Sequence, residues 1–222
     1  MNDNKNEISP LSAILAIVMT FFLILFLGGA LTYLFGYAFA LIIGELLIII
    51  IPMGYLLSKE IDIKKYIGFK ITSKNILLGL AFGAVLFLLD LVISNLLVSI
   101  IGPSDVVSEA NQIILDISKS PQGLLFLTIA LSLAGICEEF TFRGFLQTSV
   151  NSRHSFGAAL ITSSLAFGFF HFDPQALYTI SAFLLGLFLG YIYHRWNSYV
   201  ISTIAHVTLN LIVLVFFVFL LG

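Results

Sequence analysis

Charge is scarce in this sequence. Asp, Glu, Lys and Arg make up only 10% of the 222 residues, and hydrophobic residues make up 59%. Soluble globular domains carry about 25% charged residues, so this composition excludes an ordinary soluble domain and predicts an integral membrane protein. The net charge of -2 provides no basic field, and we therefore expect no nucleic acid partner.

Cysteine is almost absent, since Cys137 is the only one, and a single cysteine excludes an internal disulfide. A cleaved signal peptide is not expected, because the first apolar run is longer than a signal-peptide core. No segment is left over for a soluble domain. Residues 1–222 are therefore expected to form a single integral membrane domain.

Long apolar runs dominate instead. At about 20 residues per crossing, they predict an all-α membrane helix bundle of about seven to eight transmembrane helices, in a multi-pass protein of the cell membrane. Within these runs, Gly79/Gly83 and Gly186/Gly190 have the GxxxG spacing that permits close helix packing. The expected spans are 11–33, 37–57, 75–101, 122–150, 155–172, 176–193 and 198–221.

The loops differ in charge. Residues 58–74 are rich in lysine, whereas residues 102–122 are acidic and are expected to hold a short amphipathic helix. With seven spans, Lys5, the five loop lysines, Arg153 and Arg195 all fall on one side of the membrane. Because positive residues accumulate in cytoplasmic loops, this side and the N-terminus are predicted to be cytoplasmic.

Ionisable residues within spans are costly and indicate function by default. Glu45 and Asp90 stand alone among aliphatic residues. For these two, a neutral acid or a helix–helix hydrogen bond is the favoured interpretation. The C-terminal half differs, because its polar residues occur as spaced pairs on three separate predicted helices.

The first pair lies in the segment CEEFTFRGFLQ, residues 137–147. Glu139 and Arg143 are four residues apart with the acid first, which is the better order for an ion pair on a helix. Glu138 lies about 100° around an α-helix from Glu139, so we expect it to lack a local partner. Glu138 is therefore the free carboxylate and the candidate general base or acid.

The other pairs are Phe167 with His171, one helical turn apart before an Asp-Pro break, and His206 with Asn210 on one face of the last span. A histidine can transfer a proton, and an asparagine amide can donate to a developing oxyanion. At about 1.5 Å of rise per residue, the acid, both histidines and the asparagine reach similar depths. That depth lies in the half of the bilayer away from the lysine-rich loop.

The three pairs resemble the motifs of the CAAX protease and bacteriocin-processing family (CPBP, or Abi) of intramembrane proteases, which are E-E-x-x-x-R, F-x-x-x-H and H-x-x-x-N/D. Here they read EEFTFR, FGFFH and HVTLN, in that order. The motif-bearing core covers about residues 122–215.

The resemblance implies an intramembrane endopeptidase of the glutamic type, similar to CAAX prenyl proteases, which needs no cofactor and acts on a peptide or protein substrate, prenylated or membrane-embedded. The implied catalytic residues are Glu138, His171, His206 and Asn210, and the supporting residues are Glu139, Arg143 and Phe167. In these roles the acid and the first histidine activate water, and the second histidine and the asparagine form the oxyanion hole. The arginine and its glutamate position the catalytic helix.

Several alternatives stay open on sequence alone. His171, His206 and Glu138 are a chemically acceptable set of three zinc ligands, although the H-E-x-x-H spacing is missing. Cys137 as a nucleophile is disfavoured, because a cysteine in apolar surroundings is unreactive. A non-catalytic bacteriocin-immunity or scaffold protein, or a transporter that uses the two lone acids, would have similar spans.

The side of the membrane is a further open point. Prenylated CAAX substrates reside in the cytosol, so the resemblance implies a site that opens there. The loop charges instead place the site toward the outside, which implies either a span count in error by one or an exported or membrane-embedded substrate.

Overall fold

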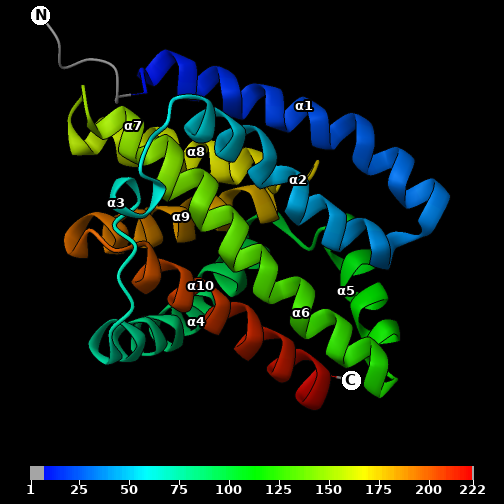
Figure 1. Ribbon diagram of the computed structural model, residues 1–222. Coiled ribbons are helices and arrows are strands. Elements are labelled where there is room, and N and C mark those ends of the chain that lie inside the picture. The colour runs from blue at the N-terminus through cyan, green and yellow to red at the C-terminus, as the bar shows by residue number, and fades with distance from the viewer. Residues whose placement is uncertain (1–7, 222) are drawn as a thin grey trace, which may run out of the picture.

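The computed structural model describes residues 8–221, which form helices and their connections without a strand in that range (Figure 1). The predicted all-α class is confirmed. The α-helices are α1 (Pro10–Phe35), α2 (Tyr37–Ser58), α3 (Ile63–Tyr66), α4 (Ser73–Ile101), α5 (Asp105–Ser118), α6 (Pro121–Glu138), α7 (Thr148–Asn151), α8 (Phe156–Phe170), α9 (Leu177–Trp196) and α10 (Tyr199–Phe216). Two π-helices, η1 (Glu139–Gln147) and η2 (Phe217–Leu221), continue α6 and α10.

Most of these helices begin at a hydroxyl side chain. The first backbone N–H groups of a helix lack an acceptor within the helix, and a serine or threonine oxygen can supply one. Proline follows this capping residue in α1 and α6, where its fixed φ suits the first turn. Such capping bonds come from Ser9, Thr72, Ser104, Ser120, Ser155 and Ser198.

Within residues 8–221, six helices are long and apolar enough to cross a membrane, as a multi-pass membrane protein requires. Six of the predicted spans correspond to them, with α6, η1 and α7 forming one continuous span, Pro121–Asn151. The remaining predicted span, 155–172, is the shorter helix α8 of 15 residues, fewer than the about 20 of a full crossing. It ends because His171 leaves helical geometry, with φ -103° and ψ 34°.

The basic turns lie together at one end of the bundle. Tyr199, at the start of α10, donates its backbone N–H to the carbonyl of Ile67 at 3.3 Å, which fastens the lysine-rich segment 59–72 to that end. The hydroxyl of Ser149 donates to the carbonyl of Ile8 at 2.9 Å, so the first described residues lie there too.

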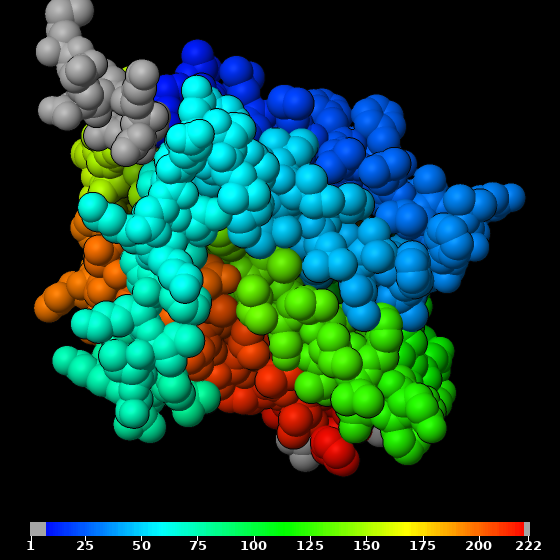
Figure 2. All heavy atoms as spheres, viewed as in Figure 1, coloured from blue at the N-terminus to red at the C-terminus, as the bar shows by residue number. Residues whose placement is uncertain are grey.

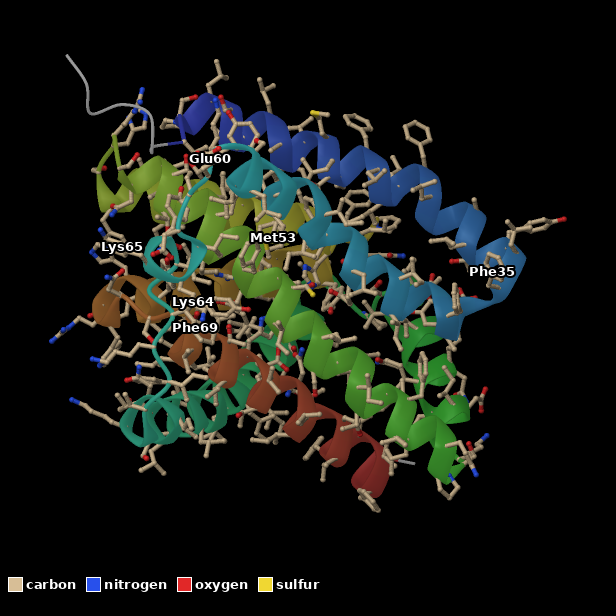
Figure 3. The ribbon with its side chains drawn as sticks, in the orientation of Figure 1. Phe35, Met53, Glu60, Lys64, Lys65 and Phe69 are labelled. Atoms are coloured by element: carbon tan, nitrogen blue, oxygen red, sulfur yellow. The ribbon has the colours of Figure 1, made fainter. Side chains whose placement is uncertain are left out.

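Lysine side chains mark this end. Figure 3 shows Lys64 and Lys65 there, and Figure 2 shows the segment 59–72 as a cyan layer between α2 and α4. The basic loops thus share one side, as the predicted topology requires, and the assignment of that side to the cytoplasm stays a prediction. Lys5, which belongs to the same argument, lies outside the described residues.

The core lies in the C-terminal half. In α1, α2 and α4, 17% of the most apolar stretch is buried within the protein, against 44% to 50% in the three later spans. The spans that carry the first and third motifs are therefore more enclosed by other helices than the N-terminal spans are. The N-terminal helices surround them and present most of their apolar side chains outward, as lipid contact requires.

Both glycine pairs mark close helix contacts, as predicted. A Cβ atom at Gly79 would lie 2.6 Å from Cβ of Ile204 on α10, and one at Gly186 would lie 3.2 Å from Cβ of Ser164 on α8. The short helix expected in the acidic loop is α5, which has no buried residue.

Candidate active site

Glu138 and Glu139 occupy the junction between two kinds of helix. Glu138 is the last residue of α6, and Glu139 is the first residue of the π-helix η1. The apolar run predicts a single span over residues 122–150, but residues 139–147 within it form a nine-residue π-helix that the sequence does not predict. Wide turns of this kind occur frequently at functional sites, and here all nine residues are buried.

The expected ion pair between Glu139 and Arg143 is present. Nη1 of Arg143 donates to Oε1 of Glu139 at 2.7 Å, and both side chains are fully buried. Nη2 of Arg143 donates to the carbonyl of Gly186 on α9 at 3.1 Å. The guanidinium also lies 4.4 Å from the centroid of the Phe167 ring, a cation–π contact. One arginine thus joins η1, α8 and α9.

His171 faces Glu138 from the end of α8. Its Nε2 lies 3.6 Å from Oε1 of Glu138, and its Nδ1 lies 2.8 Å from the carbonyl of Phe167. A carbonyl only accepts, so Nδ1 carries the proton. The ring of Phe167 at 4.5 Å and that of Tyr178 at 5.0 Å flank the imidazole.

His206 lies between the two carboxylates. Its Nδ1 is 3.1 Å from Oε1 of Glu139, and its Nε2 is 3.6 Å from Oε2 of Glu138. The ring of Phe167 packs edge-on against it at 5.7 Å. The residue spacing pairs Glu139 with Arg143 alone, and only the fold supplies the contact with His206.

The contact with Glu139 determines which ring nitrogen of His206 carries a proton. Glu139 is paired with a guanidinium and accepts, so Nδ1 of His206 carries the proton. With its proton on Nδ1, neutral His206 has a lone pair at Nε2 and can only accept a hydrogen bond there. Nε2 can donate only in the doubly protonated imidazolium form.

Asn210 lies farther along α10 and turns toward α6. Its Nδ2 donates to the carbonyl of Leu131 at 3.1 Å, about two helical turns before Glu138. One of its amide hydrogens is therefore committed to the backbone, and the second is left for another acceptor. The structure thus brings together six of the seven predicted residues directly, and Asn210 lies about one helical turn beyond His206 on α10.

The residues on the His171 side of the site are the more exposed ones. The Glu138 and His206 residues are 7% and 5% exposed, whereas Tyr178 is 49% exposed and Phe172 is 66% exposed. The loop after His171 contacts Ser104, which follows α4, and this end of α4 is opposite the lysine-rich segment.

Residues 120–212 are similar to a known protein family. They match the family described as type II CAAX prenyl endopeptidase Rce1-like, and this segment contains all three motifs, so the resemblance seen in the sequence is confirmed. No curated protein and no solved structure matches the chain.

The Rce1-like segment is supported by a helix that precedes it. Pro52 lies within α2 and has no N–H, so the carbonyl of Ile48 lacks its usual helical donor. Thr141 of η1 supplies the missing donor through its hydroxyl at 3.0 Å. Neither Pro52 nor Thr141 is among the predicted site residues, although a proline within an apolar helix indicates a backbone carbonyl that lacks its helical donor.

A second polar contact holds the other end of η1. Nε2 of Gln147 donates to the carbonyl of Gly190 at 2.8 Å, one helical turn beyond the bond from Arg143 to Gly186. Gly186 and Gly190 therefore provide two backbone carbonyls as hydrogen-bond acceptors for η1, in addition to permitting close helix packing.

The lone acids differ in their surroundings. Asp90 accepts from Ser94 at 3.5 Å within its own helix, α4. Glu45 projects from α2 within electrostatic range of Glu138, and its Oε2 is buried without a hydrogen-bond partner.

The described side chains form no group suited to bind a metal ion. Among residues 8–221, no group of three or more His, Cys, Asp or Glu side chains is arranged to hold a metal ion. Nδ1 of His206 is already engaged with Glu139, and Cys137 is buried. The geometry therefore gives no support to a zinc set of His171, His206 and Glu138.

Proposed function

We propose that this protein is an intramembrane endopeptidase of the glutamic type, CAAX-prenyl-protease-like, that hydrolyses a peptide bond with water activated by Glu138 and His171. The observation that carries the proposal is the position of Glu138, whose two carboxylate oxygens each lie 3.6 Å from Nε2 of a different histidine. The Rce1-like match of residues 120–212 supports the same reaction class.

Water activation follows from two facing acceptors. The Glu138 carboxylate only accepts, and neutral His171 with its proton on Nδ1 offers a lone pair at Nε2. A water molecule that donates one hydrogen to each satisfies both. As its oxygen attacks the scissile carbonyl carbon, one water proton passes to Glu138, and the carbonyl π electrons move onto the oxygen.

The developing oxyanion needs donors. The imidazolium of His206 offers Nε2–H, and Asn210 offers its second amide hydrogen, so both are assigned to the oxyanion hole. When the tetrahedral intermediate collapses, the carbon–nitrogen bond breaks and the leaving nitrogen takes the proton held by Glu138. Water is thus divided between the new carboxyl group and the new amine, and the enzyme returns to its starting state.

The remaining residues position these groups. Arg143, with Glu139 and Phe167, connects the helices that carry the acid and both histidines. The substrate class that fits is a prenylated or membrane-embedded peptide in the cell membrane, because the site lies within an apolar bundle. No cofactor takes part in the proposed steps.

The test is cleavage of a prenylated CAAX peptide, carrying a fluorophore and a quencher, by purified protein in lipid nanodiscs. Glu138→Gln removes the base and keeps the shape, so we expect kcat/KM to fall by at least about 100-fold, the lower range for general-base catalysis. Glu109→Gln makes the same change on exposed α5 and should leave the rate unchanged.

Equal cleavage by Glu138→Gln and wild-type protein would contradict the role given to Glu138, and absence of cleavage by wild-type protein would favour a non-catalytic immunity or scaffold protein. Comparing membrane peptides from cells with wild-type and Glu138→Gln protein extends the test to the natural substrate. A product missing from the variant would identify the cleavage site.

A further inference from the structure

Asp173 is the most fully hydrogen-bonded carboxylate in the described part of the chain outside the site. It follows His171 by two residues, is 1% exposed, and accepts from the backbone N–H of Gln175 at 3.0 Å. Its other oxygen accepts from the N–H groups of Tyr178 at 2.6 Å and Thr179 at 3.3 Å.

These bonds cap α9 from outside the helix. The residue before α9 is Ala176, which has a left-handed backbone with φ 60° and no side-chain cap. The first N–H groups of α9 therefore take their acceptor from Asp173. A carboxylate at this place also interacts favourably with the positive end of the helix dipole, so its bonds are charge-assisted and strong.

The same residue is connected to His171 by two routes. The backbone N–H of Asp173 donates to the hydroxyl of Thr179 at 3.0 Å, and that hydroxyl donates to the carbonyl of His171 at 3.2 Å. The second route runs through Tyr178, whose N–H binds Asp173 and whose ring packs edge-on against His171 at 5.0 Å.

We propose that Asp173 is a positioning residue that holds His171 in register with Glu138, with Thr179 as the hydrogen-bonded link. His171 needs such a support because it has left α8 and is followed by five residues outside any helix. Without the support, its ring would lose the fixed distance to the acid on which water activation depends. The inference rests on the proposed peptide hydrolysis and adds a residue to that site.

The link extends to the surface helix α5. Ser104, which caps α5 through the N–H of Val107 at 3.3 Å, lies with its hydroxyl 3.1 Å from Oδ1 of Asp173. The loop that carries His171 and the start of α5 therefore form one hydrogen-bonded unit at the His171 side of the site.

The experiment compares Asp173→Asn, Thr179→Val and Thr179→Ser in nanodiscs. We expect kcat to fall about 10- to 100-fold in the first two, as for a misplaced catalytic group, with KM nearly unchanged. Thr179→Ser keeps the hydroxyl and should retain wild-type kcat. Asp62→Asn is the matched control, because Asp62 caps α3 at the other end of the bundle through Lys65 N–H at 3.2 Å.

A second readout does not depend on catalysis. In protein labelled with ¹⁵N-histidine, the ring nitrogens of the four histidines report tautomers, and His171→Gln assigns the relevant signals. Wild-type His171 should show one fixed Nδ1–H tautomer, and Thr179→Val should average the two forms.

The two readouts separate this inference from the proposed function. If wild-type protein cleaves nothing, the proposed hydrolysis fails while the NMR signals still test the positioning. Wild-type kcat together with a fixed tautomer in folded Thr179→Val protein would overturn Thr179 as the link that the proposal names, even if Asp173→Asn does not fold, and the same result in folded Asp173→Asn protein would overturn the role of Asp173.

Discussion

Oε1 of Glu139 accepts hydrogen bonds from both Arg143 and His206, at 2.7 Å and 3.1 Å. Its other oxygen, Oε2, is buried without a hydrogen-bond partner. A single carboxylate oxygen therefore connects the structural ion pair of η1 to the second histidine of the site.

Glu139→Gln tests the charge of this residue apart from its hydrogen bonds. An amide oxygen can replace Oε1 and keep both bonds, but it leaves Arg143 without a counter-ion and removes the charge that favours imidazolium at His206. We expect a loss of about 3–5 kcal/mol in the free energy of unfolding, as when one partner of a buried pair is removed, together with a lower kcat. Reversible unfolding in mixed micelles measures the first and the peptide assay the second.

Asp116→Asn is the control for that substitution, since the Asp116–Lys119 pair is also close, at 2.6 Å, but exposed. Its unfolding midpoint should equal that of wild-type protein. Wild-type stability and kcat in Glu139→Gln would contradict the role given to the charge.

The contact between Thr141 and Ile48 should be measurable as a coupling with Pro52. Thr141→Val leaves the Ile48 carbonyl without a donor, at a cost of about 1–3 kcal/mol for an unsatisfied buried acceptor. In a Pro52→Ala background the backbone N–H at position 52 can serve that carbonyl, so the cost should become smaller. A double-mutant cycle gives the coupling energy.

Thr128→Val is the matched control for that cycle, because its hydroxyl donates to Leu124 within its own helix, at 2.8 Å. That variant should show no dependence on Pro52→Ala. Additive costs for Thr141→Val and Pro52→Ala would show that Thr141 does not serve the carbonyl freed by the proline.

Gly135 sets the distance between the helices of Glu138 and His206. A Cβ atom there would lie 2.7 Å from Cγ2 and 2.9 Å from the backbone N of Val207 on α10. Gly135→Ala should therefore separate α6 from α10, cost about 1–3 kcal/mol through overpacking, and lower kcat.

Gly44→Ala is its control, since nothing lies within 4 Å of the added atom in α2. There alanine should be neutral or should stabilise by up to about 1 kcal/mol through its better helix propensity. A Gly135→Ala variant with wild-type stability and kcat would rule out a tight α6–α10 contact.

Membrane orientation can be read from single cysteines after Cys137→Ala. Lys64→Cys and Glu109→Cys place thiols on exposed positions of the lysine-rich segment and of α5. If positive residues mark the cytoplasm, an impermeant maleimide should label only the second in intact cells and only the first in inverted vesicles. The reverse pattern would place the site on the cytosolic side, where prenylated substrates reside.

Parts of this site follow from spacing alone. The Glu139–Arg143 pair was predictable because residues four apart meet on a helix, and the convergence of Glu138, His171 and His206 followed from counting residues from shared turns. These arguments use one helix at a time or a simple antiparallel order. They could not reveal that Glu139 also binds His206, because that contact depends on how α10 rotates against η1.

Other features depend on the same long-range packing. The π-helix was not predictable, because its altered backbone is held by polar contacts from other helices, including those to Gly186 and Gly190 on α9. The short length of α8 was missed for a similar reason, since its apolar pattern continues to Phe172 and only the geometry at His171 ends it. The capping role of Asp173 had a local signal, an acid just ahead of a helix, but its connection to His171 through Thr179 appears only in the folded chain.

The sequence by itself determined the environment, the helical class and the identity of the polar residues within it, because each follows from composition and periodicity along the chain. The tertiary structure decided which of those residues meet, which ring nitrogen of His171 and His206 faces a hydrogen-bond acceptor, and which backbone carbonyls accept hydrogen bonds from side chains. Those properties depend on distances of a few ångströms between helices that lie far apart in the sequence, and such distances are set only when the helices pack.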